Sequence, residues 1–170
     1  MKSGAEPRRL FAVAALAIVV LDFVTKRLAE RTLLPVPPVE VLGDWLRLRL
    51  VYNQGAAFGL DLGPFQRWIF LVIAVAAVIL LWRLARTSAA GDLLRQISCG
   101  LVAGGAAGNL VDRIRSSQGV VDFIDVGVGM TRWPTFNVAD MGVSCGAIAL
   151  AVSLWLEDAR RARAGAVSST

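Results

Sequence analysis

Histidine is absent from this 170-residue chain, and its absence excludes several kinds of catalytic site at once. A chain without histidine can hold no Ser-His-Asp or Cys-His nucleophile, no HExxH zinc protease site and no histidine proton relay. Any chemistry that the chain performs must therefore use Asp, Asn, Arg, Lys and backbone groups.

Cysteine and charge are also scarce. Cys99 and Cys145 both lie in apolar segments, where a thiol usually serves as a small core side chain rather than as a disulfide partner or metal ligand. Charged residues make up 18% of the chain and apolar residues 56%, whereas a typical soluble domain carries about 25% charged residues. The net charge is +5, and the charged residues flank the apolar segments instead of clustering into one basic surface. This pattern favours a membrane protein over a protein that binds nucleic acid.

The apolar residues gather in four segments. With its flanks, each segment approaches the roughly 20 residues that a helix needs to cross a hydrocarbon core about 30 Å thick. Asp22 follows the first segment where a signal peptide would have small residues, so we expect this segment to be retained. An even number of crossings places both termini on the same side. We therefore predict an α-helical integral membrane protein with four transmembrane helices at about 10–29, 65–85, 96–113 and 136–156, between an N-terminus of 1–9 and a basic tail of 157–170.

Two further patterns refine this architecture. Residues 46–52 (LRLRLVY) alternate apolar and basic side chains, which is typical of a half-buried strand. Asn53-Gln54-Gly55 indicates a turn, after which 56–60 could return as a second strand. We expect a small β-sheet at the membrane surface between the first and second helices. In the third helix, Gly100, Gly104 and Gly108 recur every four residues, which predicts close helix packing and could leave room for a substrate.

Polar residues that are unusual in a membrane protein fall at one end of this predicted bundle. Asp22 and Lys26 lie four residues apart on one helix face and can form an ion pair. That pair either anchors the helix at the interface or belongs to a functional site. With alternating crossings, the same side of the membrane also receives Asn53, Asp112, Asp122 and Asp140. Ionisable groups so close to apolar segments are costly to bury, which indicates a function.

Paired carboxyl groups can perform acid–base chemistry without histidine. Two carboxyl groups that lie close together in poorly solvated surroundings cannot both ionise, so one keeps its proton above the usual pKa of about 3.9. The pair then supplies a general acid and a general base, as in aspartic peptidases. Asp140, beside Asn137 at a predicted helix start, is one candidate. Its partner can be Asp112, Asp122 or Asp125, and their spacing does not choose among them.

Five sequence blocks occur along the chain in a particular order. They are Asp22-x-x-Thr25-Lys26, Asn53-x-Gly55-x-Ala57-Phe58, Gly104-Gly105-x-x-Gly108-Asn109-x-x-Asp112-Arg113, Val120-Val121-Asp122-Phe123 and Phe136-Asn137-x-Ala139-Asp140. Their order, the chain length and the four-helix hydropathy resemble the lipoprotein signal peptidase family (signal peptidase II). The resemblance implies an aspartic endopeptidase of the bacterial inner membrane. Such an enzyme removes the signal peptide of diacylglyceryl-modified prolipoproteins before the lipidated cysteine.

The resemblance also assigns roles to residues. It implies that Asp122 and Asp140 are catalytic and that no metal or other cofactor takes part. It implies one peptidase domain (10–156), acting as a monomer in contact with membrane lipid, with its site and sheet extracytoplasmic and both termini cytoplasmic. Site residues carried over besides the catalytic pair are Asp22, Lys26, Asn53, Gly108, Asn109, Asp112, Arg113, Asn137 and Ala139. Those that would line the substrate site are Asn53, Asn109, Arg113 and Asn137, whereas Asp112 would pair with basic neighbours and hold the site in shape.

Other functions stay open at this point. A transporter also keeps charges within a membrane, but it would distribute them along a path across the bilayer. A magnesium-dependent phosphotransferase could use carboxylate ligands, namely Asp112, Asp122, Asp125 and Asp140, and insensitivity to EDTA would count against it. A non-catalytic scaffold would keep its full function after aspartate replacement. Asp125 is either a solvated loop carboxylate, which we favour, or a catalytic group. The five tryptophans near the ends of the apolar segments are expected to be interfacial anchors.

Overall fold

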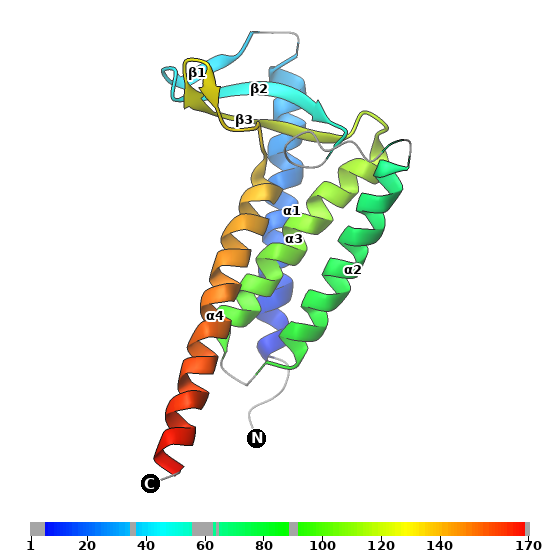
Figure 1. The fold of residues 1–170 in the computed structure, drawn as a ribbon. Helices are drawn as coiled ribbons and strands as arrows, with labels where there is room; N and C mark the ends of the chain where they lie inside the picture. The colour runs from blue at the N-terminus through cyan, green and yellow to red at the C-terminus, as the bar shows by residue number, and fades with distance from the viewer. Residues whose placement is uncertain (1–5, 35–36, 56–62, 64, 89–91, 169–170) are drawn as a thin grey trace.

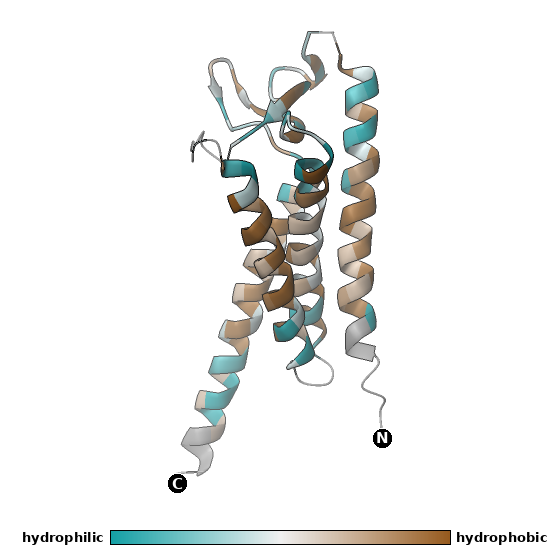
Figure 2. Cartoon of the chain, turned by 90° about the vertical axis from the view of Figure 1, so that its right-hand side faces the viewer, coloured by the Kyte–Doolittle hydropathy of each residue, from teal (hydrophilic) through white to brown (hydrophobic). Residues whose placement is uncertain are grey.

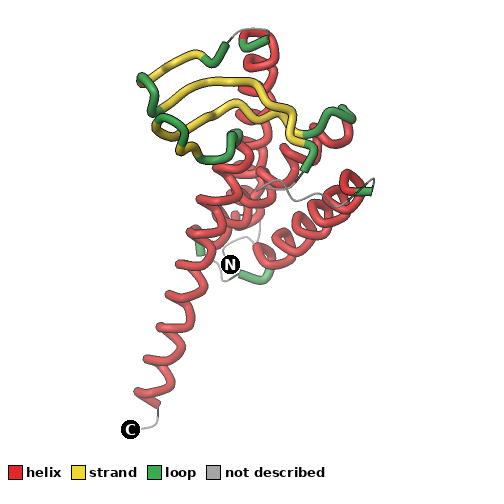
Figure 3. Tube along the Cα trace, turned by 45° about the horizontal axis from the view of Figure 1, so that its top comes forward, coloured by secondary structure: helices red, strands yellow, loops and turns green. Residues whose placement is uncertain are grey.

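Helices and a small sheet occupy opposite ends of the molecule in the computed structural model, which describes residues 6–34, 37–55, 63, 65–88 and 92–168. The elements in chain order are α1 (Glu6–Thr32), β1 (Val39–Leu42), β2 (Leu46–Asn53), α2 (Gln66–Arg86), α3 (Leu93–Arg115), β3 (Val120–Val128), β4 (Thr131–Arg132) and α4 (Val138–Ser168). The sheet lies across one end of the helices, and both termini lie toward the other end (Figure 1). The tilted view of Figure 3 shows the strands extending over the helix ends.

Two of the described helices are long and apolar enough to cross a membrane, namely α2 and the Val138–Ala164 part of α4. Asp22, Lys26 and Arg27 lie together near the end of α1, and glycines lower the hydropathy of α3. Apolar residues concentrate in the middle of the helices, with hydrophilic residues near the ends (Figure 2). Length and composition alone thus support two of the four predicted crossings.

α4 extends beyond the predicted end of the fourth helix at 156 and continues to Ser168. Just past that predicted end, Glu157 pairs with Arg95 of α3 and with Arg161, one helical turn further along α4. These ion pairs involve the part of α4 beyond the apolar segment, and the hydropathy pattern of the sequence does not reveal them. The start of α3 is fixed by Asp92, whose side chain accepts a hydrogen bond from the N–H of Arg95 (3.1 Å) and caps the helix.

α1 and α3 approach each other closely along a face of glycines. A Cβ added at Gly100 or Gly104 would lie 2.6 Å from a backbone oxygen of α1, that of Phe11 or Ala15 respectively. A Cβ added at Gly108 would lie 2.7 Å from the Asp22 carboxylate. The predicted close packing is therefore confirmed. The expectation that this face leaves room for a substrate is wrong, because α1 fills it.

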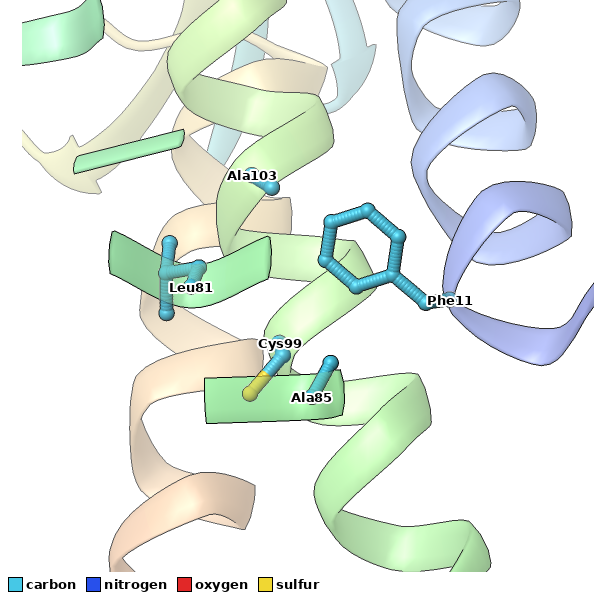
Figure 4. Close-up of a cluster of buried hydrophobic side chains, with 5 residues drawn as sticks. All are labelled: Phe11, Leu81, Ala85, Cys99 and Ala103. Carbon is cyan, nitrogen blue, oxygen red and sulfur yellow. The ribbon is translucent and has the colours of Figure 1, made fainter. Parts of the chain in front are cut away.

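A buried apolar cluster joins α1, α2 and α3 away from the sheet, and Figure 4 shows its members Phe11, Leu81, Ala85, Cys99 and Ala103. The Phe11 ring meets that of Trp82 edge-on, with centroids 5.3 Å apart. Trp82 therefore packs against other helices, contrary to the expected interfacial role. Cys99 is a core side chain as predicted, whereas Cys145 is exposed on α4 and its predicted burial is wrong.

The sheet connects two distant parts of the chain. Its strands are antiparallel in the order β1-β2-β3-β4. The strand predicted at 46–52 is present as β2, but the sheet was wrongly confined to the segment between the first two helices, because β2 also pairs with β3, which follows α3. Asp122, predicted in a loop, lies in β3. The residues 56–60, predicted to return as a strand, lie outside the described part of the chain.

A second apolar cluster holds the sheet on the end of α1. Phe123 of β3 packs with Ala29 in the last turn of α1 and with Leu33 just after that helix, and Leu48 and Leu50 of β2 contact the same cluster. β3 is buried over its first four residues, so it lacks the alternation by which a half-buried strand is recognised. This contact fixes the height of β3, and hence of Asp122, relative to the helices.

We expect Gly104→Val to lower thermal stability, because its Cβ would meet the backbone of Ala15 rather than a side chain that can turn aside. Overpacking of this kind costs about 1–3 kcal/mol. Ala151→Val is the control, because it adds the same branched side chain on an exposed part of α4. Thermal unfolding in detergent measures both variants. Equal melting temperatures for Gly104→Val and the wild type would contradict the close contact of α1 with α3.

Candidate active site

Two carboxyl groups, those of Asp122 and Asp140, line one cavity of about 670 Å³ beneath the sheet. Asp122 comes from β3, and Asp140 lies in the first turn of α4. Asn137 joins them, because its side-chain amide donates to Asp122 Oδ1 (2.7 Å) and its backbone N–H donates to Asp140 Oδ2 (3.1 Å). We refer to Asp122 and Asp140 as the carboxyl pair.

The chain between β4 and α4 brings these groups together by folding back onto β3. The backbone N–H groups of Phe123 and Ile124 both donate to the carbonyl oxygen of Phe136, at 3.0 and 2.8 Å. Phe136 in turn donates to the Ile124 carbonyl at 3.0 Å. The next residue, Asn137, then caps α4, because its side-chain oxygen accepts the N–H of Asp140 at 2.9 Å. The hydrogen bonds between Phe136 and β3 thus place the carboxylate of Asp122 beside the N-terminus of α4.

Neutral donors hold all four oxygens of the carboxyl pair. The second oxygen of Asp122 accepts a hydrogen bond from the side-chain amide of Asn53 in β2 (2.9 Å). The second oxygen of Asp140 accepts one from the side-chain amide of Asn109 in α3 (2.8 Å). The pair is therefore oriented from three sides, by β2, by α3 and by the start of α4.

Lys26 lies behind the pair, and its side chain is only 1% exposed. Its ammonium group contacts Asp22 at 2.7 Å, Asp112 at 2.8 Å and the side-chain oxygen of Asn109 at 2.9 Å. These three acceptors match the three donors of an ammonium group. Because Lys26 contacts the oxygen of Asn109, the amide nitrogen of Asn109 faces Asp140. The predicted pairing of Asp22 with Lys26, and of Asp112 with a basic neighbour, is confirmed.

The two carboxylates that hold Lys26 also hold backbone groups of the site. Asp22 Oδ1 accepts the N–H of Ala139 at the start of α4 (2.8 Å), and Asp112 Oδ2 accepts the N–H of Val121 in β3 (3.2 Å). Ala139 is fully buried, and Gly108 lies against both Asp22 and Ala139, where a Cβ would not fit. Lys26 and its two carboxylates thus fix the positions of β3 and α4, the elements that carry the carboxyl pair.

The residues predicted to form the site come together, but in two groups. Five of them line the cavity: Asn53, Asn109, Arg113, Asp122 and Asp140. The others lie behind it: Asp22, Lys26, Gly108, Asp112, Asn137 and Ala139. Asn137 was expected to line the substrate site, but its side chain is fully buried and acts on the carboxyl pair from behind.

Arg113 donates to the carbonyl oxygen of Asn109 (3.2 Å) and lies over the ring of Phe70.

Asp125 is not the solvated loop carboxylate that the sequence suggested. It lies in β3, is 2% exposed, and pairs with Arg132 at 2.7 Å. Arg132 also reaches Asp44 in the turn between β1 and β2 (3.2 Å). Asp125 is absent from the lining of the cavity. It therefore belongs to an ion-pair cluster that joins the two hairpin turns of the sheet.

The carboxylates considered as magnesium ligands have different partners. Asp112 faces Lys26 and Asp125 faces Arg132, so the four do not converge on one point. Within the described residues, no group of three or more potential metal-binding side chains was found. Metal chemistry at this cavity therefore has no support from its donor set.

Several lining residues were missed by the sequence analysis. They are Arg49, Val51, Trp133, Pro134, Thr135, Phe136, Val143 and Ser144. Arg49 and Val51 could have been found, because they precede Asn53 by four and two residues in a strand and so share its face. The residues 133–135 carry no such signal, since only the return of the chain onto β3 brings them to the cavity, whereas Phe136 begins the last of the five sequence blocks. Trp133, expected to be an interfacial anchor, is part of this lining.

The carboxyl pair is electrostatically asymmetric. The pKa of Asp122 is raised to about 6, chiefly by burial and also by the neighbouring charge of Asp140, although the hydrogen bonds from Asn53 and Asn137 act in the opposite direction. Asp140 instead lies at the N-terminus of α4, where the helix dipole favours an anion. The two carboxyl groups thus lie in different electrostatic surroundings.

Solved structures with the same fold define the class of this protein. Two structures described as bacterial membrane enzymes superpose with TM-scores of 0.78 and 0.74, at 30% and 31% sequence identity. The superpositions cover 88% and 85% of this chain and 90% and 91% of theirs. The shared fold, together with a polar cavity at the end of apolar helices, defines a bacterial membrane enzyme.

Sequence relatives narrow that class to a family. The family model described as Signal peptidase (SPase) II matches residues 14–156. The chain is 44% identical over 154 residues to the lipoprotein signal peptidase of Rhodococcus jostii, covering 85% of this chain and 72% of the relative. It is 43% identical over 150 residues to that of Hydrogenovibrio crunogenus, covering 84% of each. The chain belongs to the signal peptidase II family and is a membrane peptidase.

We expect Lys26→Met to be strongly destabilising, because it leaves Asp22 and Asp112 buried without a counter-ion. Breaking a buried ion pair in this way costs about 3–5 kcal/mol. Asp112→Asn should also destabilise the wild type, but in the Lys26→Met background it removes an uncompensated charge and should recover part of the loss. Thermal unfolding of the four proteins measures this coupling. Strictly additive effects would show that the charges act independently.

The raised pKa of Asp122 predicts a pH-dependent stability. Because the folded pKa of about 6 lies above the reference value of 3.8, the stabilising contribution of the protonated group is fully present below pH 3.8 and is lost as the pH rises through about 6. The loss is roughly 3 kcal/mol. Asp122→Asn cannot ionise, so its melting temperature should rise relative to the wild type between pH 4 and pH 7. Parallel melting curves for the two proteins across this range would contradict the raised pKa.

Proposed function

We propose that this chain is an aspartic endopeptidase that removes the signal peptide of diacylglyceryl-modified prolipoproteins, cleaving before the lipidated cysteine. The observation that carries the proposal is that Asp122 and Asp140 line one cavity and are joined by Asn137. The relatives named lipoprotein signal peptidase support the choice of substrate. No cofactor is needed, because the two carboxyl groups supply both an acid and a base.

Asp122 holds the proton that the pair shares, and Asp140 is the ionised base. The raised pKa of Asp122 and the position of Asp140 at a helix N-terminus support this assignment. Substrate binding excludes water from the cavity, which further disfavours a second negative charge on the pair.

The reaction begins when Asp140 removes a proton from a water molecule whose oxygen attacks the scissile carbonyl carbon. Asp122 gives its proton to the carbonyl oxygen, which forms a tetrahedral diol. As the carbon–nitrogen bond breaks, the proton held by Asp140 passes to the leaving amine. Asp122 recovers a proton from a diol hydroxyl as the new carboxyl group forms. The pair thus returns to its starting protonation state.

Arg113 holds the substrate in this scheme. It uses one hydrogen bond on the carbonyl oxygen of Asn109, and a guanidinium group has five donors. Its remaining donors are available to carbonyl oxygens of the substrate peptide or of the ester-linked lipid. Asn53 and Asn109 keep the carboxyl pair oriented as the substrate enters.

The membrane topology belongs to the same proposal. All four helices cross the inner membrane, with both termini cytoplasmic and the cavity at the extracytoplasmic face. The sheet at one end of the helices and the termini toward the other end support this arrangement (Figure 1). The polar groups of α1 and α3 that lower their hydropathy are shielded from lipid by contact with one another, as Lys26 with Asp112 illustrates. The enzyme acts as a monomer that draws its substrate laterally from the lipid.

A gel-shift assay on a diacylglyceryl prolipoprotein tests the mechanism. We expect Asp122→Asn and Asp140→Asn each to lower the cleavage rate at least about a hundredfold, because each removes the acid or the base. Asp125→Asn is the matched control, since it replaces a buried carboxylate of the same strand that does not line the cavity. It should still cleave, and thermal melts check the folding of every variant.

Further outcomes separate this mechanism from its alternatives. Cleavage should persist in EDTA, and its loss there would favour a metal-dependent enzyme. A folded Asp122→Asn variant that cleaves at the wild-type rate would show that the carboxyl pair is wrongly assigned. If the wild type never cleaves this substrate, the proposed substrate is wrong.

A further inference from the structure

Arg49 is a charged residue of the cavity to which the proposed reaction gives no role. The ionisable residues lining the cavity are the carboxyl pair and two arginines, Arg49 and Arg113. Arg113 has a hydrogen bond to Asn109 and a ring contact beside the pair. Apart from the carboxyl pair, the charged side chains of the lining are therefore all positive. Arg49 is the one of these that belongs to the sheet.

Arg49 differs from the neighbouring arginines of the sheet, because it has no partner among the described residues. Arg47, two residues earlier in β2, pairs with Asp44 and with Glu40. Arg132 of β4 pairs with Asp125 and Asp44. Arg49 is exposed, and among the described residues no hydrogen bond or ion pair engages its guanidinium group. The acidic residues of the sheet thus neutralise the other two arginines and leave this one available to a ligand.

The strand places Arg49 at a definite distance from the carboxyl pair. Arg49, Val51 and Asn53 all line the cavity, and Asn53 donates directly to Asp122. Four residues of strand span roughly 13 Å, and the irregular pairing of β2 between Leu48 and Val51 shortens this span. An extended substrate advances about 3.4 Å per residue. The long side chain of Arg49 therefore reaches a substrate residue about two to five positions from the scissile bond.

The location of the sheet identifies the side of the scissile bond that Arg49 contacts. A signal peptide is apolar where it lies in the bilayer, and a guanidinium group is costly to place there. The sheet lies beyond the helix ends (Figures 1 and 3). The substrate segment that passes beneath it is the polar one that follows the cleavage site.

We propose that Arg49 is a specificity residue that favours acidic and disfavours basic side chains two to five positions after the cleavage site of the substrate. This inference rests on the proposed function. The carboxylate of the substrate pairs with the guanidinium group of Arg49, while a lysine there is repelled by the two arginines of the cavity. Pairing at an exposed site is modest, so the effect is a preference in kcat/KM and not an absolute requirement.

Charge reversal tests the proposal. Diacylglyceryl prolipoprotein substrates that carry Asp, Asn or Lys at one of these positions are cleaved by the wild-type enzyme, by Arg49→Gln and by Arg49→Glu. At one position or more, the wild type should prefer the Asp substrate over the Lys substrate about fivefold in kcat/KM. Arg49→Gln should remove the preference, and Arg49→Glu should reverse it.

Arg31→Glu is the matched control. It makes the same change of charge in the last turn of α1, near the same end of the molecule, at an exposed residue that does not line the cavity. It should keep the wild-type order of substrates, because solvent and salt screen an exposed charge that does not line the cavity. Thermal melts of all variants check that folding is unchanged.

The other outcomes would overturn the proposal. If Arg49→Glu keeps the wild-type order of substrates, Arg49 does not contact the substrate peptide. If Arg49→Glu slows all three substrates equally, and does so only in vesicles that contain phosphatidylglycerol besides phosphatidylcholine, Arg49 binds lipid phosphate instead. A wild-type enzyme that cleaves none of the substrates would remove the proposed function and this inference together. That result is distinguishable, because the first two outcomes require cleavage by the wild type.

Discussion

The buried ammonium group of Lys26 is the constraint on which the rest of the site depends. A charge this far from water is tolerated only when it is paired and fully hydrogen-bonded, and Lys26 meets that condition with Asp22, Asp112 and Asn109. Each partner has a second contact elsewhere in the site: Asp22 with α4, Asp112 with β3 and Asn109 with Asp140. Satisfying one cation therefore fixes the relative positions of three helices, a strand and a carboxyl group. The glycines of α3 belong to the same constraint, because Gly108 lets α1 come close enough for Asp22 to take part.

Much of this arrangement could be predicted from local sequence, and the rest depends on contacts between distant segments. The spacing of Asp22 and Lys26 on one helix turn predicts their pairing, and the four-residue repeat of glycines predicts the close approach of α1 and α3. The position of Asp122 could not be predicted in the same way. β3 is buried at its start, so it has no alternating pattern, and its partner β2 lies about 70 residues earlier in the chain. Asp125 was misjudged for the same reason, since its partner Arg132 is brought near only by the hairpin of β3 and β4.

The sheet places groups that the helices alone could not place. A carboxylate on a membrane helix is surrounded by side chains of its own and neighbouring helices, whereas Asp122 projects from a strand that lies across the helix ends. Asp140 comes from the helix that begins directly beneath, and Asn137 connects the two through its side chain and its backbone. Because β2 contributes Asn53 and the residues 133–136 line the cavity, the proposed substrate site lies between sheet and helices. The same strand β2 also carries Arg49, so one strand holds both the group that orients Asp122 and the group proposed to contact the substrate further along its chain.

The proposed mechanism requires one proton on the carboxyl pair, and the donors around the pair suit this requirement. A lysine or arginine in direct contact with Asp122 or Asp140 would favour the charged form of both groups, and a doubly ionised pair has no acid. Asparagine amides and a backbone N–H orient all four oxygens without a full positive charge. Lys26 contacts Asn109, which in turn donates to Asp140, so its ammonium group is separated from the carboxyl pair by a neutral side chain. The site must be held rigid by charged groups, and yet nearby positive charge would remove the proton from the carboxyl pair. These two requirements conflict in a medium of low dielectric constant, and different groups meet them. A charged cluster behind the pair provides rigidity, and a layer of neutral amides between them favours the shared proton that the proposed mechanism requires.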